Sequence, residues 1–267
     1  MRRTVFLIMM VVALSMVTIA TAANRYNRPE SVIKIPGEHA ILIANVGTGT
    51  ITRLSLFDNK TSVWAKGLNG PKGMAILDGK LYVADETEIK CLDLSNGKIL
   101  KNIPVSASKF LNDACTDGKC IYVTDMETNK LLKFDPVANE ISEFVIDGLE
   151  SPNGICFDKE NNRLLLNSFR SNSPIQAIDL DDGSVSTLLE TEKSKLDGIA
   201  LTSDGNILFS SWETGALYLY KTTKQKFKVL KNGYSGPADF WLDEEAGKIF
   251  LPVMMEDRID IIGFSVE

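Results

Sequence analysis

Histidine is nearly absent from this sequence, which contains a single one, His39, in 267 residues. A Ser-His-Asp triad needs a histidine beside its serine, and His39 falls in the expected first hairpin turn, far from the candidate site described below. Histidine and cysteine clusters of the kind that hold zinc or iron are missing, and no glycine-rich phosphate loop precedes a helix. The sequence therefore disfavours triad hydrolases, histidine-based metal sites and phosphate-loop nucleotide binding.

Basic charge is also in short supply. Lysine and arginine number 29 against 35 aspartate and glutamate residues, which gives a net charge of −6 and a pI of about 5.1. Nucleic-acid binding rests on a basic surface, so we expect no nucleic-acid partner. Beyond the N-terminal segment the sequence has no second long hydrophobic run and no Pro/Ser-rich linker, which predicts one domain over residues 24–267.

The one long apolar run lies at the start of the chain. A basic segment, Met1 to Thr4, precedes an apolar run over 5–19, and Ala20 to Ala22 has the small-x-small pattern of a cleavage site. We predict a secretory signal peptide over residues 1–22; the alternative is an uncleaved N-terminal anchor. No cysteine lies near the cleavage site, as a lipoprotein would require. We expect a secreted or periplasmic protein without stable membrane insertion after cleavage.

A short motif recurs six times in the rest of the chain. Its copies begin near residues 29, 71, 111, 152, 196 and 237, and the clearest reads Pro152-Asn153-Gly154-Ile155. The copies are roughly 40 to 44 residues apart, the period of propeller blades. Short apolar strands follow each copy, and Asp-Gly pairs at 78–79, 117–118 and 204–205 indicate hairpin turns. The pattern predicts an all-β, six-bladed β-propeller of four-stranded antiparallel blades.

Closure of the propeller is left open by the pattern. The chain ends after the expected third strand of blade six, so a fourth strand would have to come from residues 24–28 or be missing.

Four cysteines in a chain expected to be exported raise the question of disulfides. If Asp117-Gly118 forms a two-residue turn, Cys115 lies opposite Cys120 at a Cα separation that suits a disulfide. We therefore predict a Cys115–Cys120 disulfide. Cys91 and Cys156 fall in blades that are not neighbours, and we expect two buried thiols.

The second position of the repeated motif is the candidate for chemistry. The first strand of each blade lines the channel of a propeller, so equivalent residues form a ring at one mouth. This ring reads Glu30, Lys72, Asn112, Asn153, Asp197 and Ala238. Carboxylate and amide oxygens from four blades suit a hard cation such as Ca²⁺ better than zinc. The alternative is that Asn and Asp occur here because they tolerate turn geometry.

Lys72 has two interpretations. Its ammonium could bind an anionic substrate group or stabilise negative charge that develops near the metal. We prefer a second interpretation, in which Lys72 pairs with Glu30 or Asp113 from the neighbouring blades, because clustered carboxylates usually recruit a cation. A Lys72–Glu30 pair would compete with metal binding.

These motifs resemble those of the senescence-marker protein, gluconolactonase and luciferin-regenerating enzyme family of six-bladed propellers, over essentially the whole mature chain. The resemblance implies that Glu30, Asn153 and Asp197 bind one divalent cation, that Asp197 is the general base, and that Asn112 holds water or substrate. The chain departs from the family pattern at Ala114, which stands in place of a glycine, and just upstream of Asn112, where Lys109-Phe110-Leu111 lacks an arginine that family lactonases carry.

The resemblance implies metal-assisted hydrolysis of a lactone or related ester, with Ca²⁺ as the expected cation. Asp197 would accept a proton from the attacking water, and Asn112, Lys72 and Asp113 would contact the substrate. The competing hypothesis is a non-catalytic exported propeller that binds a ligand or protein and holds a structural metal or none. We expect the protein to be a monomer and its partner to be a small-molecule substrate or ligand.

Overall fold

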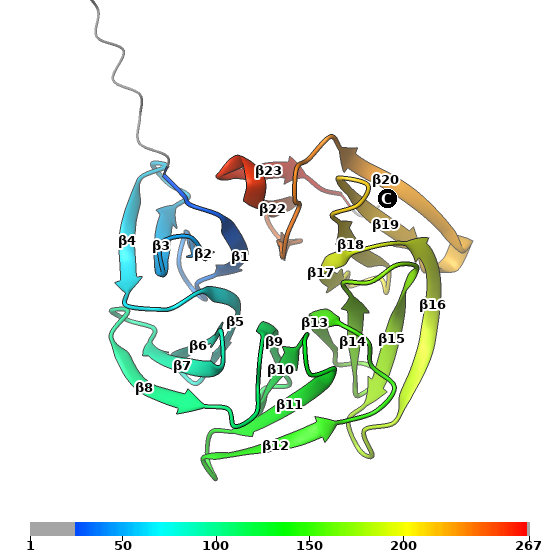
Figure 1. Cartoon of the computed structure of the whole chain (residues 1–267). Helices are drawn as coiled ribbons and strands as arrows, with labels where there is room; N and C mark the ends of the chain where they lie inside the picture. Colours follow the sequence, from blue (N-terminus) through cyan, green and yellow to red (C-terminus); the bar gives the residue numbers. More distant parts are fainter. Residues whose placement is uncertain (1–24, 266–267) are drawn as a thin grey trace, which may run out of the picture.

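Six small antiparallel sheets surround one axis in the computed structural model, which describes residues 25–265 (Figure 1). Five sheets have four strands and the sixth has three, so the prediction of a six-bladed all-β propeller is confirmed. The predicted signal peptide over residues 1–22 lies outside the described residues. Across residues 25–265, no helix has the length and apolar character needed to cross a membrane.

The strands follow the chain from the axis outward in each blade. Blade one contains β1 (Pro29–Lys34), β2 (Ala40–Asn45), β3 (Thr50–Ser55) and β4 (Thr61–Lys66). Blade two contains β5 (Pro71–Leu77), β6 (Lys80–Asp85), β7 (Glu88–Asp93) and β8 (Ile99–Pro104). Blade three contains β9 (Leu111–Thr116), β10 (Ile121–Asp125), β11 (Lys130–Asp135) and β12 (Glu140–Val145).

The second half repeats this order. Blade four contains β13 (Pro152–Asp158), β14 (Arg163–Ser168), β15 (Ser173–Asp179) and β16 (Val185–Lys193). Blade five contains β17 (Leu196–Leu201), β18 (Ile207–Ser211), β19 (Ala216–Lys221) and β20 (Lys226–Asn232), with the short helix η1 (Thr222–Lys224) between the last two. Blade six contains β21 (Trp241–Asp243), β22 (Lys248–Val253), η2 (Met254–Glu256) and β23 (Arg258–Gly263).

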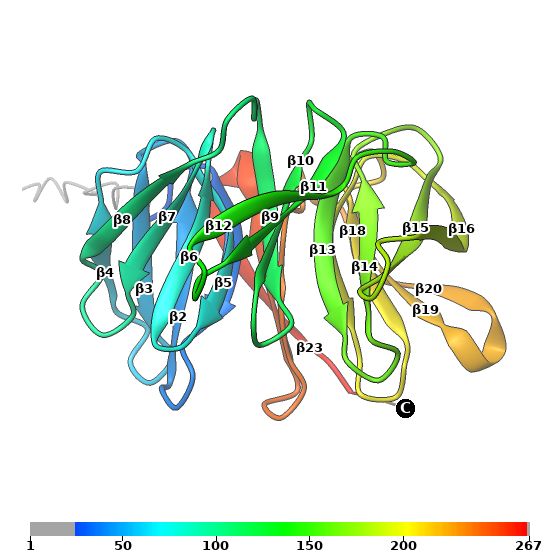
Figure 2. The same cartoon turned by 90° about the horizontal axis from the view of Figure 1, so that it is seen from below.

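Burial explains the composition of inner and outer strands. The second strand β2, with the sequence AILIAN, is buried along its whole length, because neighbouring blades cover both of its faces. The outermost strand β12, with the sequence EISEFV, exposes most of its side chains. The hydrophobic core therefore lies in layers between blades, as where Ala75 and Tyr82 of blade two pack with Leu111 and Val123 of blade three. Figure 2 shows the molecule from the side, with the strands of the blades arranged around the axis.

The first and last blades meet at the axis. Ser31 of β1 forms a parallel bridge with Asp239, whose backbone N–H donates to the Glu30 carbonyl at 3.0 Å. Residues 25–28 form no strand, and the described part of blade six has no fourth strand. Among residues 25–265, blade six therefore has three strands, which agrees with the alternative of a missing fourth strand. Tyr26 instead packs beside Phe250 of β22.

The three Asp-Gly hairpins differ in length. Asp78-Gly79 is a two-residue turn, because Leu77 pairs with Lys80. Asp204-Gly205 lies in a longer loop, since the nearest strand pair is Leu201 with Ile207. His39 is exposed in the turn between β1 and β2, as expected.

The Asp117-Gly118 turn corrects the disulfide prediction. Thr116 pairs with Ile121, so the loop has four residues and Cys115 lies opposite Tyr122 rather than Cys120. The longer loop is held by the Asp117 carboxylate, which accepts hydrogen bonds from two backbone N–H groups of the loop. The predicted Cys115–Cys120 disulfide is wrong, and both residues are free thiols. Cys91 is a buried thiol as expected, whereas Cys156 is only partly buried.

Polar side chains on three of the second strands form hydrogen bonds with the backbone of the following blade. The Thr124 hydroxyl donates to the Asn153 carbonyl, the Ser210 hydroxyl donates to the Ala238 carbonyl, and the Asn167 amide donates to the Asp197 carbonyl. All three donors occupy the last position but one of β10, β18 and β14. These buried bonds hold the first strand of the next blade beside the axis.

Close contact between inner strands gives a first testable prediction. A Cβ added at Gly154 would lie 1.9 Å from the Asp197 carbonyl oxygen, which is backbone and cannot move aside cheaply. Gly154→Ala should therefore lower the free energy of unfolding by about 2 kcal/mol or more, measured by urea denaturation. Gly263→Ala is the matched control, since nothing lies within 4 Å of the added Cβ. Equal urea midpoints for the two variants would contradict this close packing.

Candidate metal and substrate site

A break in strand pairing creates the ring. In blade two Pro71 pairs with Asp85 and the next pair is Met74 with Val83, so the two residues between them are out of register. The break also spans the motif's second and third residues in blades three, four and five, whereas in blade one it spans Glu30 alone. Bulges of this kind release side chains from the regular alternation of a strand and redirect them. The motif's second and third positions are thereby free to face the channel.

The structure brings the predicted ring residues together as buried groups. Each is less than a tenth exposed: Glu30, Lys72, Asn112, Asn153 and Asp197. Asp197, Asp113 and Lys72 all lie close enough to Glu30 for their charges to act on its carboxyl group. Asn153 lies beside Asp197, and its amide nitrogen donates to the Leu196 carbonyl at 3.0 Å.

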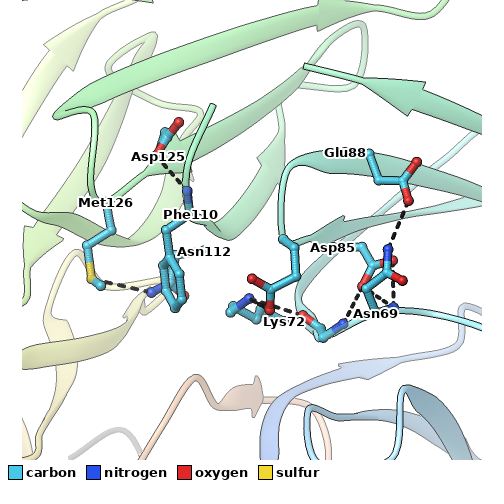
Figure 3. A network of polar contacts seen from close by, with 10 residues as sticks. Asn69, Lys72, Asp85, Glu88, Phe110, Asn112, Asp125 and Met126 are labelled. Carbon is cyan, nitrogen blue, oxygen red and sulfur yellow. Dashed lines mark hydrogen bonds and ion pairs between the residues drawn. The ribbon is translucent and has the colours of Figure 1, made fainter. Parts of the chain in front are cut away.

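Three oxygen atoms of the ring have no hydrogen-bond partner. They are Glu30 Oε2, Asn112 Oδ1 and Asn153 Oδ1, all buried. The amide nitrogens are engaged instead: that of Asn112 donates to the Met126 sulfur at 3.7 Å (Figure 3). A buried acceptor without a donor costs free energy of about 1–3 kcal/mol. Three such oxygens in one ring form a site that a cation or a donor group would stabilise.

The carboxyl groups of the channel have raised pKa values. Burial raises the pKa of Glu30 well above its usual range, and the carboxylates of Asp197, Asp239 and Asp113 raise it further. Burial and the Asp239 charge raise the pKa of Asp197 to about 8, although the nearby Trp212 indole and Asn153 amide oppose the shift. Without a cation, Asp197 therefore retains its proton near neutral pH.

Asp239 is a site residue that the motif did not reveal. The sixth copy reads Pro237-Ala238-Asp239, with its acid one position later than in copy five. The Ser31 hydroxyl donates to the Asp239 carboxylate at 2.6 Å, and burial raises the pKa of Asp239 to about 7 despite this bond. The signal was present in the sequence, because this third position is otherwise glycine or serine in every copy except the third.

Asp113 occupies the same third position in copy three. Its two carboxylate oxygens accept hydrogen bonds from the backbone N–H groups of Ala114 at 2.7 Å and Ile155 at 2.8 Å. The contact with Ile155 links blade three to blade four. Burial and the Asp239 charge raise the pKa of Asp113, while the two hydrogen bonds lower it.

The preferred interpretation of Lys72 was wrong. Its ammonium pairs with Glu86 at 2.9 Å, and neither Glu30 nor Asp113 is its partner. It also donates to the Gly70 carbonyl at 3.1 Å and lies 4.3 Å from the centre of the Phe110 ring (Figure 3). Since Glu30 Oε2 has no partner, the expected competition between Lys72 and a cation for this carboxylate is absent.

The acids at the ends of the second strands have structural roles. Asp85 accepts hydrogen bonds from the backbone N–H groups of Asn69 and Gly70, and Asp125 does the same for the segment before β9 (Figure 3). Each carboxylate thereby fixes the loop that leads into an inner strand. Trp212, near Asp197, meets Phe169 edge to face at 5.7 Å.

A cavity of about 490 Å³ occupies the channel on the other side of the ring. Its walls are mainly apolar and include Val32, Ile155 and Ile199, while Asp113 and Asp239 reach its inner end. Among residues 25–265, no three His, Cys, Asp or Glu side chains are arranged as a metal-binding group. A cation at the ring would therefore depend on the amide oxygens as well as the carboxylates.

Comparison with known families agrees with this geometry. The family model described as the SMP-30/Gluconolactonase/LRE-like region matches residues 28–239. The chain belongs to this family. The match contains the five ring residues with polar side chains and ends at Asp239, so it covers the candidate site of this family member. A search of curated proteins found no match.

Solved structures share the fold of this family member at low identity. A structural genomics protein of unknown function from Bacteroides thetaiotaomicron is 12% identical, with a TM-score of 0.76 over 89% of this chain and 70% of that chain. Hydrazine synthase from Kuenenia stuttgartiensis is 16% identical, with a TM-score of 0.70 over 93% and 80%. A nidogen/laminin complex is 18% identical, with a TM-score of 0.67 over 84% and 93%. These likenesses extend to the fold alone.

The raised pKa values predict an unusual pH dependence. An acid whose pKa is raised on folding holds protons that the unfolded chain releases, so stability is complete near pH 4 and falls as pH rises through about 7 to 8. In the presence of a chelator, the midpoint of thermal unfolding should therefore drop between about pH 5 and about pH 9. Asp239→Asn should reduce this drop, whereas Asp182→Asn, an exposed acid, should not. Unchanged melting across this range would contradict the raised pKa values.

Proposed function

We propose that this propeller is a divalent-metal-dependent hydrolase of a lactone or related ester. Glu30, Asn153 and Asp197 would hold the cation, and Asn112 would contact the substrate. The observation that carries the proposal is the set of buried ring oxygens without hydrogen-bond partners. Membership of a family that includes lactonases supports the same conclusion.

The donor set fits a hard cation. Calcium takes six to eight oxygen ligands, which include carboxylates, amide carbonyls and water. Glu30, Asn153 and Asp197 supply two carboxylates and one amide, so water or substrate would complete the shell. A bound cation would polarise the substrate carbonyl and would lower the pKa values of Glu30 and Asp197. We therefore expect Ca²⁺ rather than zinc, which prefers nitrogen and sulfur ligands.

Asp197 would act as the general base. A water molecule attacks the lactone carbonyl carbon while its proton passes to the Asp197 carboxylate. The ring C–O bond then breaks, the same proton goes to the departing alkoxide oxygen, and the product is a hydroxy acid. The Trp212 indole and the Asn153 amide beside Asp197 would restrain the carboxylate. Asn112 Oδ1, which lacks a partner, would orient a substrate hydroxyl.

The second candidate function is non-catalytic ligand binding. It is favoured by the burial of the ring residues and by the position of the cavity, which opens on the opposite side of the ring. In that case a metal at the ring would be structural, and the mouth or the cavity would bind a partner. We propose export to a secreted or periplasmic location for both functions, on the basis of residues 1–22.

Calcium binding tests the metal site. Isothermal titration calorimetry of the wild-type protein should show one site, and Asp197→Asn should weaken binding at least tenfold because it removes a charged ligand. Glu150→Gln is the matched control: it removes one acid that is 64% exposed in its side chain and pairs with Arg170. Equal affinities for wild-type protein and Asp197→Asn would contradict the proposed ligand set.

Hydrolysis tests catalysis separately. With calcium bound, a pH-stat assay on gluconolactone and simple aryl esters should detect acid release, which a chelator should abolish. Asp197→Asn should lower kcat by about 100-fold or more, a typical effect of losing a general base. Calcium binding without hydrolysis of any lactone or ester would favour the non-catalytic function.

A further inference from the structure

We infer that Lys72 is an anion-binding subsite covered by Glu86, and that the substrate carries a carboxylate besides its lactone or ester group. This inference rests on the proposed function, because it names the substrate class of the same site. It derives from the contacts of one buried ammonium group, which differ from those of a structural ion pair.

Lys72 is a ring residue, 4% exposed, between the blades that carry Glu30 and Asn112. Three groups meet its ammonium: the Gly70 carbonyl, the Glu86 carboxylate and the face of Phe110. The carbonyl and the aromatic ring carry no net charge. Glu86 therefore supplies the ion-pair partner of Lys72, as expected because burying an unpaired ammonium is costly.

Glu86 is the exposed member of this pair. The side chain of Glu86 is 40% exposed, whereas that of Lys72 is 5% exposed. Glu86 lies in the turn after β6, on the ring side of the blade, and its carboxylate rests against Gly70. An added Cβ at position 70 would lie 2.2 Å from Glu86 Oε1, so a larger residue there would displace this flexible side chain. Glycine thus leaves room for a carboxylate directly over Lys72.

The neighbouring lysine shows how a structural pair differs. Lys90, in the same blade, is also buried, but it meets two acids, Glu88 at 2.6 Å and Asp85 at 3.8 Å. Asp85 is buried and Glu88 is partly buried, and neither carboxylate has a buried oxygen without a hydrogen-bond partner. Lys90 is therefore fully compensated within its blade. Lys72, by contrast, has a single exposed carboxylate that another anion can replace.

The position of Lys72 sets the chemistry of the ligand. Its charge acts on the Glu30 carboxyl group, and Asn112 occupies the same motif position in the adjacent blade; both residues supply buried oxygens without partners. A single small molecule could then make both contacts. Its carbonyl would contact the cation held by the ring oxygens, and its carboxylate would contact the Lys72 ammonium. Phe110 provides a flat apolar wall next to this contact. A sugar acid lactone combines a carboxylate, a carbonyl and an apolar ring face.

Calorimetry with a matched ligand pair tests this inference. Galacturonate and galactose differ by a carboxylate in place of a CH₂OH group, and both are titrated into calcium-loaded and calcium-free protein. We expect galacturonate to bind about tenfold or more tightly than galactose, as a charge-assisted hydrogen bond requires. Lys72→Met should abolish this preference. Glu86→Gln should raise it severalfold, because it removes the competing anion and leaves the surface side chain in place.

The controls separate the two proposals. Lys90→Met breaks a buried ion pair of the same blade and should leave the preference unchanged. Two results would overturn the anion subsite even if calcium binds. One is equal binding of galacturonate and galactose, and the other is that Glu86→Gln loses the preference for galacturonate as Lys72→Met does. Absence of calcium binding with a preserved Lys72-dependent preference would instead overturn the metal hydrolase and leave the anion subsite standing.

Discussion

Four carboxyl groups converge on the axis of this propeller without an equal positive charge beside them. Glu30, Asp113, Asp197 and Asp239 are buried, burial raises the pKa of each, and the Asp239 charge raises the pKa values of the other three further. The ammonium of Lys72 is near, but it is held by Glu86. The folded protein can relieve this repulsion by keeping protons or by binding a cation. Both the stability of the fold and the chemistry of its channel depend on which of these occupies the ring.

The scaffold imposes this convergence. Inner strands lie so close together that glycine is needed at position 154, where the chain contacts the Asp197 backbone. The break in strand register at this motif turns Asn153, the residue before the glycine, toward the axis. Hydrogen bonds from Asn167 to the Asp197 and Gly198 carbonyls hold the next strand in place. The second motif position, which supplies the ring side chain, is therefore next to the third position, where glycine allows the strands to pack closely. This adjacency explains why one repeated scaffold can present side chains of different kinds from different blades.

The sequence predicted the fold because its signal is repeated, and it predicted most of the ring because ring residues share one motif position. Asp239 was missed because the sixth copy carries its acid one residue later, outside strand β21, where the Ser31 hydroxyl of blade one donates to its carboxylate. The partner of Lys72 was missed because Glu86 lies on a turn outside the motif, and only the return of β6 to the ring side brings it there. The disulfide prediction failed on loop length, since the side-chain oxygens of Asp117 and Thr116 accept hydrogen bonds from backbone N–H groups and stabilise a longer loop than the Asp-Gly pair alone would form.

Proton release on calcium binding tests the central claim most directly. If the ring acids are protonated in the metal-free protein, calcium must displace protons as it binds. Calorimetric titrations at about pH 6.5, repeated in buffers of different ionisation enthalpy, count these protons, and repetition at about pH 9 provides the comparison. The account predicts release of about one proton or more at the lower pH and markedly less at the higher pH. Calcium binding with no proton release at either pH would contradict it, because the carboxyl groups would then be ionised without a cation.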